Sequence, residues 1–427
     1  MRSLAFCTTC HFVDRPVTPV ASTYQSNAAT TASSATVPAS SHTTNRRPPG
    51  HGEQEVDVGP AAAFVGADEH DGSRAASPWE PGAPRRFVAW LLGTLVVLLA
   101  CVFAFDYYVD ATGVTGRNTK WNVVENAKDR TVKLDYYERM RDDPPQTVLL
   151  GSSRVMKFQP SVVEAITGKR TFNAAVSGGT PEDSLLFVKL IAQRQPDDFP
   201  HLVWGVDVDA FRDKQLRDGL AQDPRTQQFL STPRRIANTV TMVGTLLERQ
   251  TLETSIRSVR RGGPPKSVAA QRTYAPDGFQ EWELHPVAST PYLLRQQVAT
   301  EMRQYTQAIF VRDAYTEVEE APTRDFEELI RIANRHGDVP TVFLTPYQPG
   351  AKRFLDEYDI DARTREVRAL LRRLQSGHGL RFELADFTDL ETFGGDPSEF
   401  YDGVHMSTVN TSAALRELGR RGLLTRP

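Results

Sequence analysis

An uninterrupted apolar run near residue 90 most restricts how this 427-residue chain can fold. Nineteen consecutive residues, Phe87 to Phe105, carry no charge, and only one glycine and one threonine weaken the run. As a helix the run would be about 28 Å long, which matches the hydrocarbon core of a bilayer. A core helix would show a polar stripe, and a signal peptide would be shorter and end at a small-residue cleavage site. The run therefore predicts a transmembrane helix over 85–108, embedded through 87–105.

The charges on either side of this run indicate its orientation. Arg85 and Arg86 precede it, whereas Asp106 and Asp110 follow it. Positive flanks stay in the cytoplasm, so the N-terminus is predicted there and the long C-terminal part on the other side. We expect a single-pass protein of a bacterial cytoplasmic (inner) membrane, with a periplasmic or extracellular C-terminal domain.

The segment before the membrane helix has a composition that does not support a core. Residues 1–84 are rich in Ala, Ser, Thr, Pro and Gly, which predicts a disordered cytoplasmic tail. The whole chain has a formal net charge of −3 with both signs interspersed, so no basic stripe for nucleic acid is expected. All three cysteines lie within the first 101 residues. Covalent catalysis in the C-terminal part would therefore need an oxygen nucleophile.

Beyond the membrane helix, the pattern changes to alternating strands and helices. Residues 109–145 predict a helical stalk that ends at Pro144 and Pro145. Residues 146–425 predict a three-layer α/β fold with a mainly parallel sheet. Residues 212–320 interrupt the alternation with helical runs and are interpreted as an insertion over the carboxyl edge of the sheet. The expected strands are 147–150, 199–208, 339–347 and 380–387, and the expected helices include 181–195 and 323–337, the latter capped by Thr323 and Gly337.

Polar residues at the carboxyl ends of parallel strands are the candidates for chemistry. The first group is "GSSR", Gly151 to Arg154, which is either an ordinary turn or a site that presents a nucleophilic hydroxyl. A serine needs a base within hydrogen-bond reach to act as a nucleophile. The second group, "NAAVSGGTPED", could form a nest of backbone N–H groups around Gly178 for an oxyanion, or a tight turn in which Thr180 caps the next helix.

Two acidic groups complete the candidates. Asp207 and Asp209 in "GVDVDAF" could bind a cation or a sugar, or could be solvated. Asp402 stands three residues before His405 in "DGVHMS", a spacing that lets the carboxylate orient the imidazole as a base. The other histidines after the membrane helix are interpreted as surface or loop residues: His201, His285, His336 and His378.

The order of three of these groups resembles the SGNH or GDSL hydrolase family. "GSSR" is similar to its first block, "NAAVSGGT" to its second and "DGVHMS" to its last. The resemblance implies Ser153 as nucleophile, His405 as base, Asp402 as its partner, and the N–H groups of Ser153 and Gly178 as oxyanion donors. It implies no metal ion and no organic cofactor. Arg154, Asp207 and Asp209 are added as substrate-binding candidates, Arg154 for an anionic group.

The anchor also resembles the membrane-anchored branch of that superfamily, such as the teichoic-acid D-alanylation and alginate O-acetylation proteins. This implies a serine esterase or O-acyltransferase acting on an envelope polysaccharide or another acylated glycan, with a membrane-bound acyltransferase or polysaccharide synthase as candidate partner. The third block departs from the family, because "GVDVDAF" lacks the asparagine of Gly-x-Asn-Asp. An ionised aspartate cannot donate to an oxyanion. The alternative is therefore a catalytically inactive glycan-binding or scaffolding component of an assembly machine.

Overall fold

The computed structural model describes residues 83–115, 117, 119–121, 126–212, 220, 223–263, 274–281, 287–377 and 379–425. The predicted disordered tail falls outside these residues, except for its last two positions, which begin the first helix. That helix, α1 (Ala83–Val109), is long and apolar enough to cross a membrane over Arg85–Val109.

Five parallel strands form the sheet at the centre of the C-terminal part. They are β1 (Thr147–Leu150), β2 (Thr171–Asn173), β3 (His201–Val206), β4 (Thr341–Leu344) and β5 (Glu383–Asp386). The strand order is β2-β1-β3-β4-β5, and every neighbouring pair is parallel. The predicted α/β class and parallel sheet are thus confirmed. In this order the chain leaves β1 and β3 in opposite directions, so a crevice opens between their carboxyl ends.

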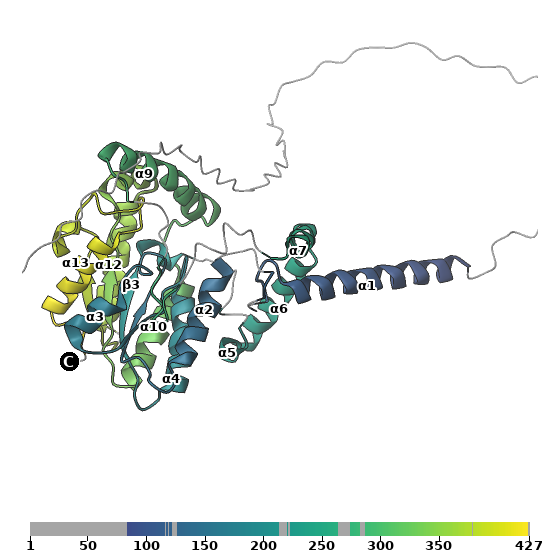
Figure 1. Ribbon diagram of the computed structural model, residues 1–427, viewed down its shortest axis with the longest axis horizontal. Coiled ribbons are helices and arrows are strands. Elements are labelled where there is room, and N and C mark those ends of the chain that lie inside the picture. Colours follow the sequence, from purple (N-terminus) through teal and green to yellow (C-terminus); the bar gives the residue numbers. More distant parts are fainter. Residues whose placement is uncertain are drawn as a thin grey trace, which may run out of the picture. The chain divides into compact units, whose positions relative to one another are not determined.

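Helices cover both faces of this sheet (Figure 1). On one side α4 packs along α10, and on the other α13 packs on α3. The helices within the domain are α2 (Asn126–Arg139), α3 (Pro160–Thr167), α4 (Pro181–Arg194), α5 (Pro224–Gln227), α6 (Thr232–Leu246), α7 (Arg249–Arg261), α9 (Pro291–Thr306), α10 (Glu320–Arg335), α11 (Lys352–Leu355), α12 (Ile360–Gly377) and α13 (Thr408–Arg420). Short turns are η1 (Val208–Phe211), η2 (Gln307–Arg312, a π-helix), η3 (Pro349–Ala351), η4 (Asp356–Tyr358) and η5 (Leu390–Phe393).

The helix predicted as a stalk is instead part of the domain. Tyr137 of α2 packs edge-on against Phe172 and Phe187. Lys133, one turn earlier on the same helix, is fully buried. The Lys133 ammonium donates to the carbonyls of Asn173, at 2.7 Å, and of Gly278. Burial lowers the pKa of Lys133 to about 7. The segment 109–145 therefore contributes core contacts as well as the connection to α1.

The predicted capping of α10 is wrong at its N-terminus. The helix begins at Glu320, one turn earlier than expected, and Thr323 uses its hydroxyl to donate to the Glu319 carbonyl within the first turn. A threonine hydroxyl that bonds back to the preceding turn is compatible with a helix interior. At the other end Gly337 has φ +77°, a left-handed conformation that suits glycine just after a helix.

Candidate active site

The turn after β1 presents one serine and buries its neighbours. Gly151 has φ +148°, and a Cβ there would lie 2.5 Å from Val155, so only glycine fits. The Ser152 hydroxyl accepts from the Arg154 N–H at 3.2 Å, and the Ser152 carbonyl accepts from the Val155 N–H at 2.9 Å. Ser152 and Arg154 are buried, whereas Ser153 is partly exposed. The local geometry therefore leaves the Ser153 hydroxyl as the accessible one.

A tight loop near the C-terminus holds the acid and the imidazole. The Tyr401 N–H donates to the His405 carbonyl at 2.9 Å, which closes the loop. One carboxylate oxygen of Asp402 accepts the N–H groups of Val404 and His405, at 2.7 and 2.8 Å. These bonds fix the position of the Asp402 carboxylate within the loop.

The structure brings Ser153, His405 and Asp402 into one hydrogen-bonded chain. His405 Nε2 lies 2.8 Å from Ser153 Oγ, and His405 Nδ1 lies 2.6 Å from the second oxygen of Asp402. Burial raises the pKa of Asp402, but the charge of His405 and the three hydrogen bonds outweigh burial and hold it below its ordinary value. An ionised carboxylate only accepts, so Nδ1 carries the ring proton and Nε2 is free to accept from the serine. This is the arrangement that general-base activation of a hydroxyl needs.

The turn after β2 packs directly against the turn that carries Ser153. The Val176 N–H donates to the Gly151 carbonyl at 3.1 Å, and a Cβ on Gly179 would meet that same carbonyl oxygen at 2.6 Å. Gly178, between them, has φ +56°. Thr180 caps α4 in a reciprocal capping box with Asp183, so the capped turn, one of the two alternatives left open by the sequence, is present. The predicted oxyanion donor is thus on a turn in contact with the Ser153 turn, and the direction of its N–H stays a prediction.

Asn173 connects the turn after β1 with the turn after β2. Its side-chain amide donates to the carbonyls of Val155 and Phe158, both at 2.9 Å, and its oxygen accepts from the Ala175 N–H at 3.0 Å. The side chain is fully buried. Asn173 therefore holds the segment after Ser153 and the turn after β2 together.

Arg154, Asp207 and Asp209 bind one another. Arg154 lies 3.2 Å from Asp209 and 3.6 Å from Asp207, and it is only 3% exposed. Thr345, after β4, donates to Asp207 at 2.6 Å. Burial lowers the pKa of Arg154, but Asp207 and the other acidic neighbours raise it well above its ordinary value. The arginine is thus a permanent cation within the protein, and its predicted contact with an anionic substrate stays a prediction.

Tyrosines from distant segments close this buried network, and the sequence analysis missed them. Tyr305 of α9 donates to Asp209 at 2.7 Å and also contacts Arg154. Tyr347 places its ring 4.3 Å from the Arg154 guanidinium. Arg212 forms a second ion pair with Asp209. The predicted insertion thus reaches the carboxyl edge through α9, and no local pattern in the sequence marks Tyr305 for this contact.

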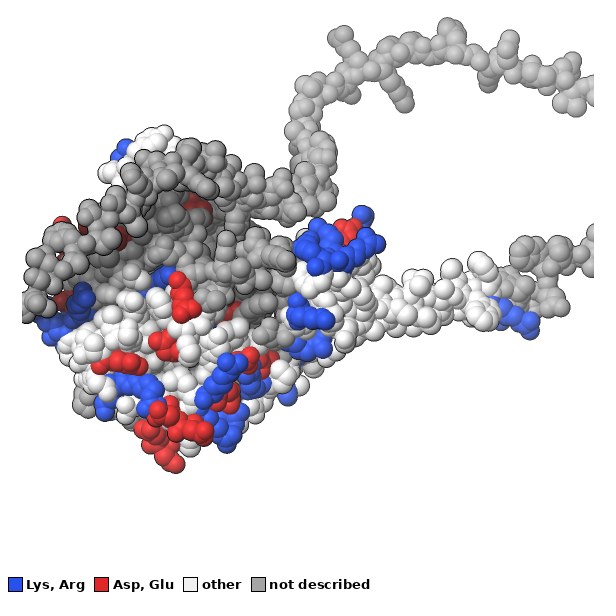
Figure 2. All heavy atoms as spheres, viewed as in Figure 1, with Lys and Arg blue, Asp and Glu red and all other residues white. Residues whose placement is uncertain are grey.

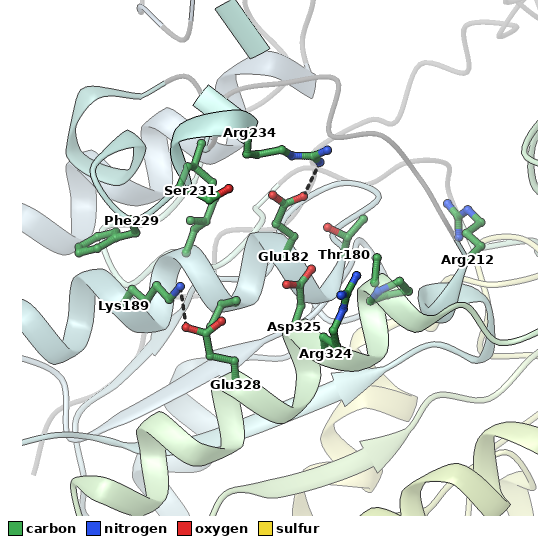
Figure 3. Close-up of a pocket in the computed structure, with 15 residues that line it drawn as sticks. Thr180, Glu182, Lys189, Arg212, Phe229, Ser231, Arg234, Arg324, Asp325 and Glu328 are labelled. Atoms are coloured by element: carbon green, nitrogen blue, oxygen red, sulfur yellow. Dashed lines mark hydrogen bonds and ion pairs between the residues drawn. The ribbon is translucent and has the colours of Figure 1, made fainter. Parts of the chain in front are cut away.

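A charged pocket of about 480 Å³ lies beside this network (Figure 3). Its walls are α4, α10 and the segment that leads into α6, and Arg212 links it to Asp209. Glu182 pairs with Arg234 at 2.9 Å, and Lys189 pairs with Glu328 at 2.8 Å. Burial raises the pKa of Glu182 to about 7 and that of the neighbouring Asp325 to about 6. The pocket therefore holds carboxyl groups that gain and lose protons near neutral pH.

Removal of the Glu182 charge should change how stability depends on pH. A folded-state pKa of about 7, against an ordinary value of 4.5, stabilises the fold at low pH, and this contribution is lost as pH rises from about 4.5 to 7. As the pH rises from roughly 5 to 8, the free energy of unfolding of Glu182→Gln should therefore increase by about 1–2 kcal/mol relative to that of the parent, as measured by urea unfolding. Glu253→Gln, at an exposed helix position, is the control. An equal gain in both variants would contradict the burial argument.

The two other described histidines, His201 and His336, lie away from this site. His201 is buried, contrary to its interpretation as a surface residue, because Nδ1 bonds Asp338 at 2.9 Å at the amino end of β3. His336 is at the end of α10 and stacks on Phe199. His285 and His378 are outside the described residues. Among the described residues, no group of three or more His, Cys, Asp or Glu side chains is placed to hold a metal ion.

Two comparisons with known proteins find no match to this chain. A scan against protein-family models finds none that matches the chain, and a search of curated proteins also finds no match.

Proposed function

We propose that the chain is a membrane-anchored serine esterase or O-acyltransferase of the SGNH type, acting on acyl groups of a cell-envelope or extracellular polysaccharide. One observation carries the chemistry: Ser153, His405 and Asp402 form a continuous hydrogen-bonded chain at the carboxyl edge of the sheet. The helix α1 supports the membrane anchor. The glycan substrate, the bacterial envelope and a partner acyltransferase or synthase are inferred from the motif resemblance.

The proposed reaction begins with attack of Ser153 Oγ on the acyl carbonyl. His405 Nε2 takes the hydroxyl proton as the carbon–oxygen bond forms, and Asp402 stabilises the resulting imidazolium. The oxyanion would be bound by the N–H groups of Ser153 and Gly178. The intermediate then expels the alcohol of the donor ester, which receives the proton from His405, and leaves an acyl group on Ser153. Water or a sugar hydroxyl repeats these steps in reverse to release the acyl group.

Detection of the acyl-enzyme tests this proposal directly. The full chain in detergent, incubated with p-nitrophenyl acetate and quenched in acid, should carry an acetyl group on the peptide that contains Ser153. Peptide mass spectrometry locates the group. Heat-denatured protein treated in the same way is the control for chemical acetylation. Acetylation that is equal in native and denatured protein would contradict covalent catalysis by Ser153.

The non-catalytic alternative is motivated by Asp207. Its carboxylate stands where the family has an asparagine donor, and it is engaged by Thr345 and Arg154. A glycan-binding or scaffolding protein would keep its cellular role after Ser153→Ala or His405→Ala, but would lose it when the insertion 212–320 is deleted. If the two point variants alone reproduce the deletion phenotype, the alternative fails.

A further inference from the structure

The helices α6 and α7 pack against the C-terminal end of α1. Along α1 the side chains of residues 85–101 are exposed, whereas Asp106 and Val109 are buried. The buried face of α7 includes Ser255 and Ser258. The two helices therefore cover α1 at the point where its exposed apolar surface ends, as their position beside it in Figure 1 also shows.

This point corresponds to the level of the lipid headgroups if α1 crosses a bilayer. The apolar run that ends at Phe105 has the length of the hydrocarbon core, so the next turn enters the interface. Aromatic side chains are found there, as is usual for an interface: Tyr108 packs on Trp121 with ring centroids 5.4 Å apart, and Arg117 lies over Tyr107. Helices that pack around this turn lie at the same level.

The outer surface of α6 and α7 carries exposed apolar side chains. Ile236 and Val240, one turn apart on α6, are 60% and 66% exposed. Leu247, between the helices, and Val259 of α7 are 37% and 40% exposed. Side chains four residues apart share one face of a helix, so Ile236 and Val240 form a continuous apolar strip. The described part of the domain leaves this strip uncovered.

The same two helices also carry exposed arginines, and Figure 2 shows basic side chains gathered beside one end of α1. The exposed ones on the two helices are Arg235, Arg249, Arg257, Arg260 and Arg261. They are opposed by two exposed acids, Glu248 and Glu253, of which Glu253 pairs with Arg249 at 2.7 Å. Helices that combine exposed apolar side chains with several arginines are typical of membrane interfaces.

We propose that the α6–α7 surface, formed by the exposed apolar and arginine side chains of α6 and α7, binds the anionic lipid headgroups of the bilayer that α1 enters. The apolar strip reaches the boundary of the acyl chains, and the arginines pair with lipid phosphates. Ser231 and Arg234, next to and in α6, line the charged pocket. The contact therefore connects the charged pocket to the membrane surface through α6.

Site-specific quenching by lipid tests this contact in the full chain. The protein is placed in nanodiscs after Cys7, Cys10 and Cys101 are replaced by serine, and a single cysteine at Val259→Cys carries an environment-sensitive dye. Ile166→Cys on α3 is the matched control, because Ile166 is also 40% exposed. With a headgroup-linked nitroxide lipid, we expect quenching at position 259 to exceed that at position 166 by about fivefold.

Lipid charge and a charge-reversal variant provide the second measurement. Quenching at position 259 should require phosphatidylglycerol, and R257E/R260E/R261E should reduce its anionic-lipid-dependent part about tenfold. Circular dichroism checks that this variant is folded, and Ile236→Ser with Val240→Ser provides an independent variant that should also reduce quenching. Equal quenching at the two positions, or quenching at position 259 that does not change with phosphatidylglycerol, would overturn the proposal.

Discussion

Ser153→Ala is expected to abolish labelling of the chain by a fluorophosphonate and to lower hydrolysis of p-nitrophenyl acetate by at least about 10³-fold. The reason is that Ser153 Oγ is the hydroxyl within 2.8 Å of His405 Nε2, and it is more accessible than its buried neighbour Ser152. In-gel fluorescence measures the labelling, and initial rates on the full chain in detergent measure the hydrolysis.

Ser152→Ala is the matched control for this experiment. The Ser152 hydroxyl accepts a hydrogen bond from within its own turn, so its loss should lower stability by about 1 kcal/mol and leave labelling at Ser153. Labelling that survives in Ser153→Ala and disappears in Ser152→Ala would move the nucleophile by one residue. Equal labelling of both variants and the parent would eliminate both serines.

Asp402→Asn should reduce turnover by about 10⁴-fold with little change in fold. An amide in place of the carboxylate can donate to His405 Nδ1, which would move the ring proton to Nε2, and Nε2 could then no longer accept from Ser153. The measurement is kcat on p-nitrophenyl acetate, together with the thermal unfolding midpoint.

Asp396→Asn provides the comparison for this second experiment, because Asp396 is an exposed acid shortly before Asp402 in the chain and its carboxylate accepts from the N–H and hydroxyl of Ser398. It should keep turnover within about twofold of the parent. A loss below tenfold in Asp402→Asn would show that the carboxylate does not set the tautomer of His405.

The sequence predicts β1 and the pairing of Asp402 with His405 well because both depend on local signals. The run at 147–150 coincides with β1, and Asp402 stands near His405 in the chain, so their pairing follows from spacing. Thr171–Asn173 is too short to show a strand pattern, so the sequence predicts no range for β2. The contacts of Tyr305 with Asp209 and Arg154 depend on how α9 packs, which no periodicity encodes. The packing of α2 against Phe172 and Phe187 likewise depends on tertiary contacts that the sequence pattern does not show.

The separation of Ser153 from His405 in the sequence determines when their contact can form during synthesis. These residues are 252 positions apart, and His405 lies after the last strand, near the end of the chain. During synthesis Ser153, its turn and the five strands emerge before His405. Under the proposed function, the chain therefore has no activity until the loop that carries Asp402 and His405 has folded against the Ser153 turn.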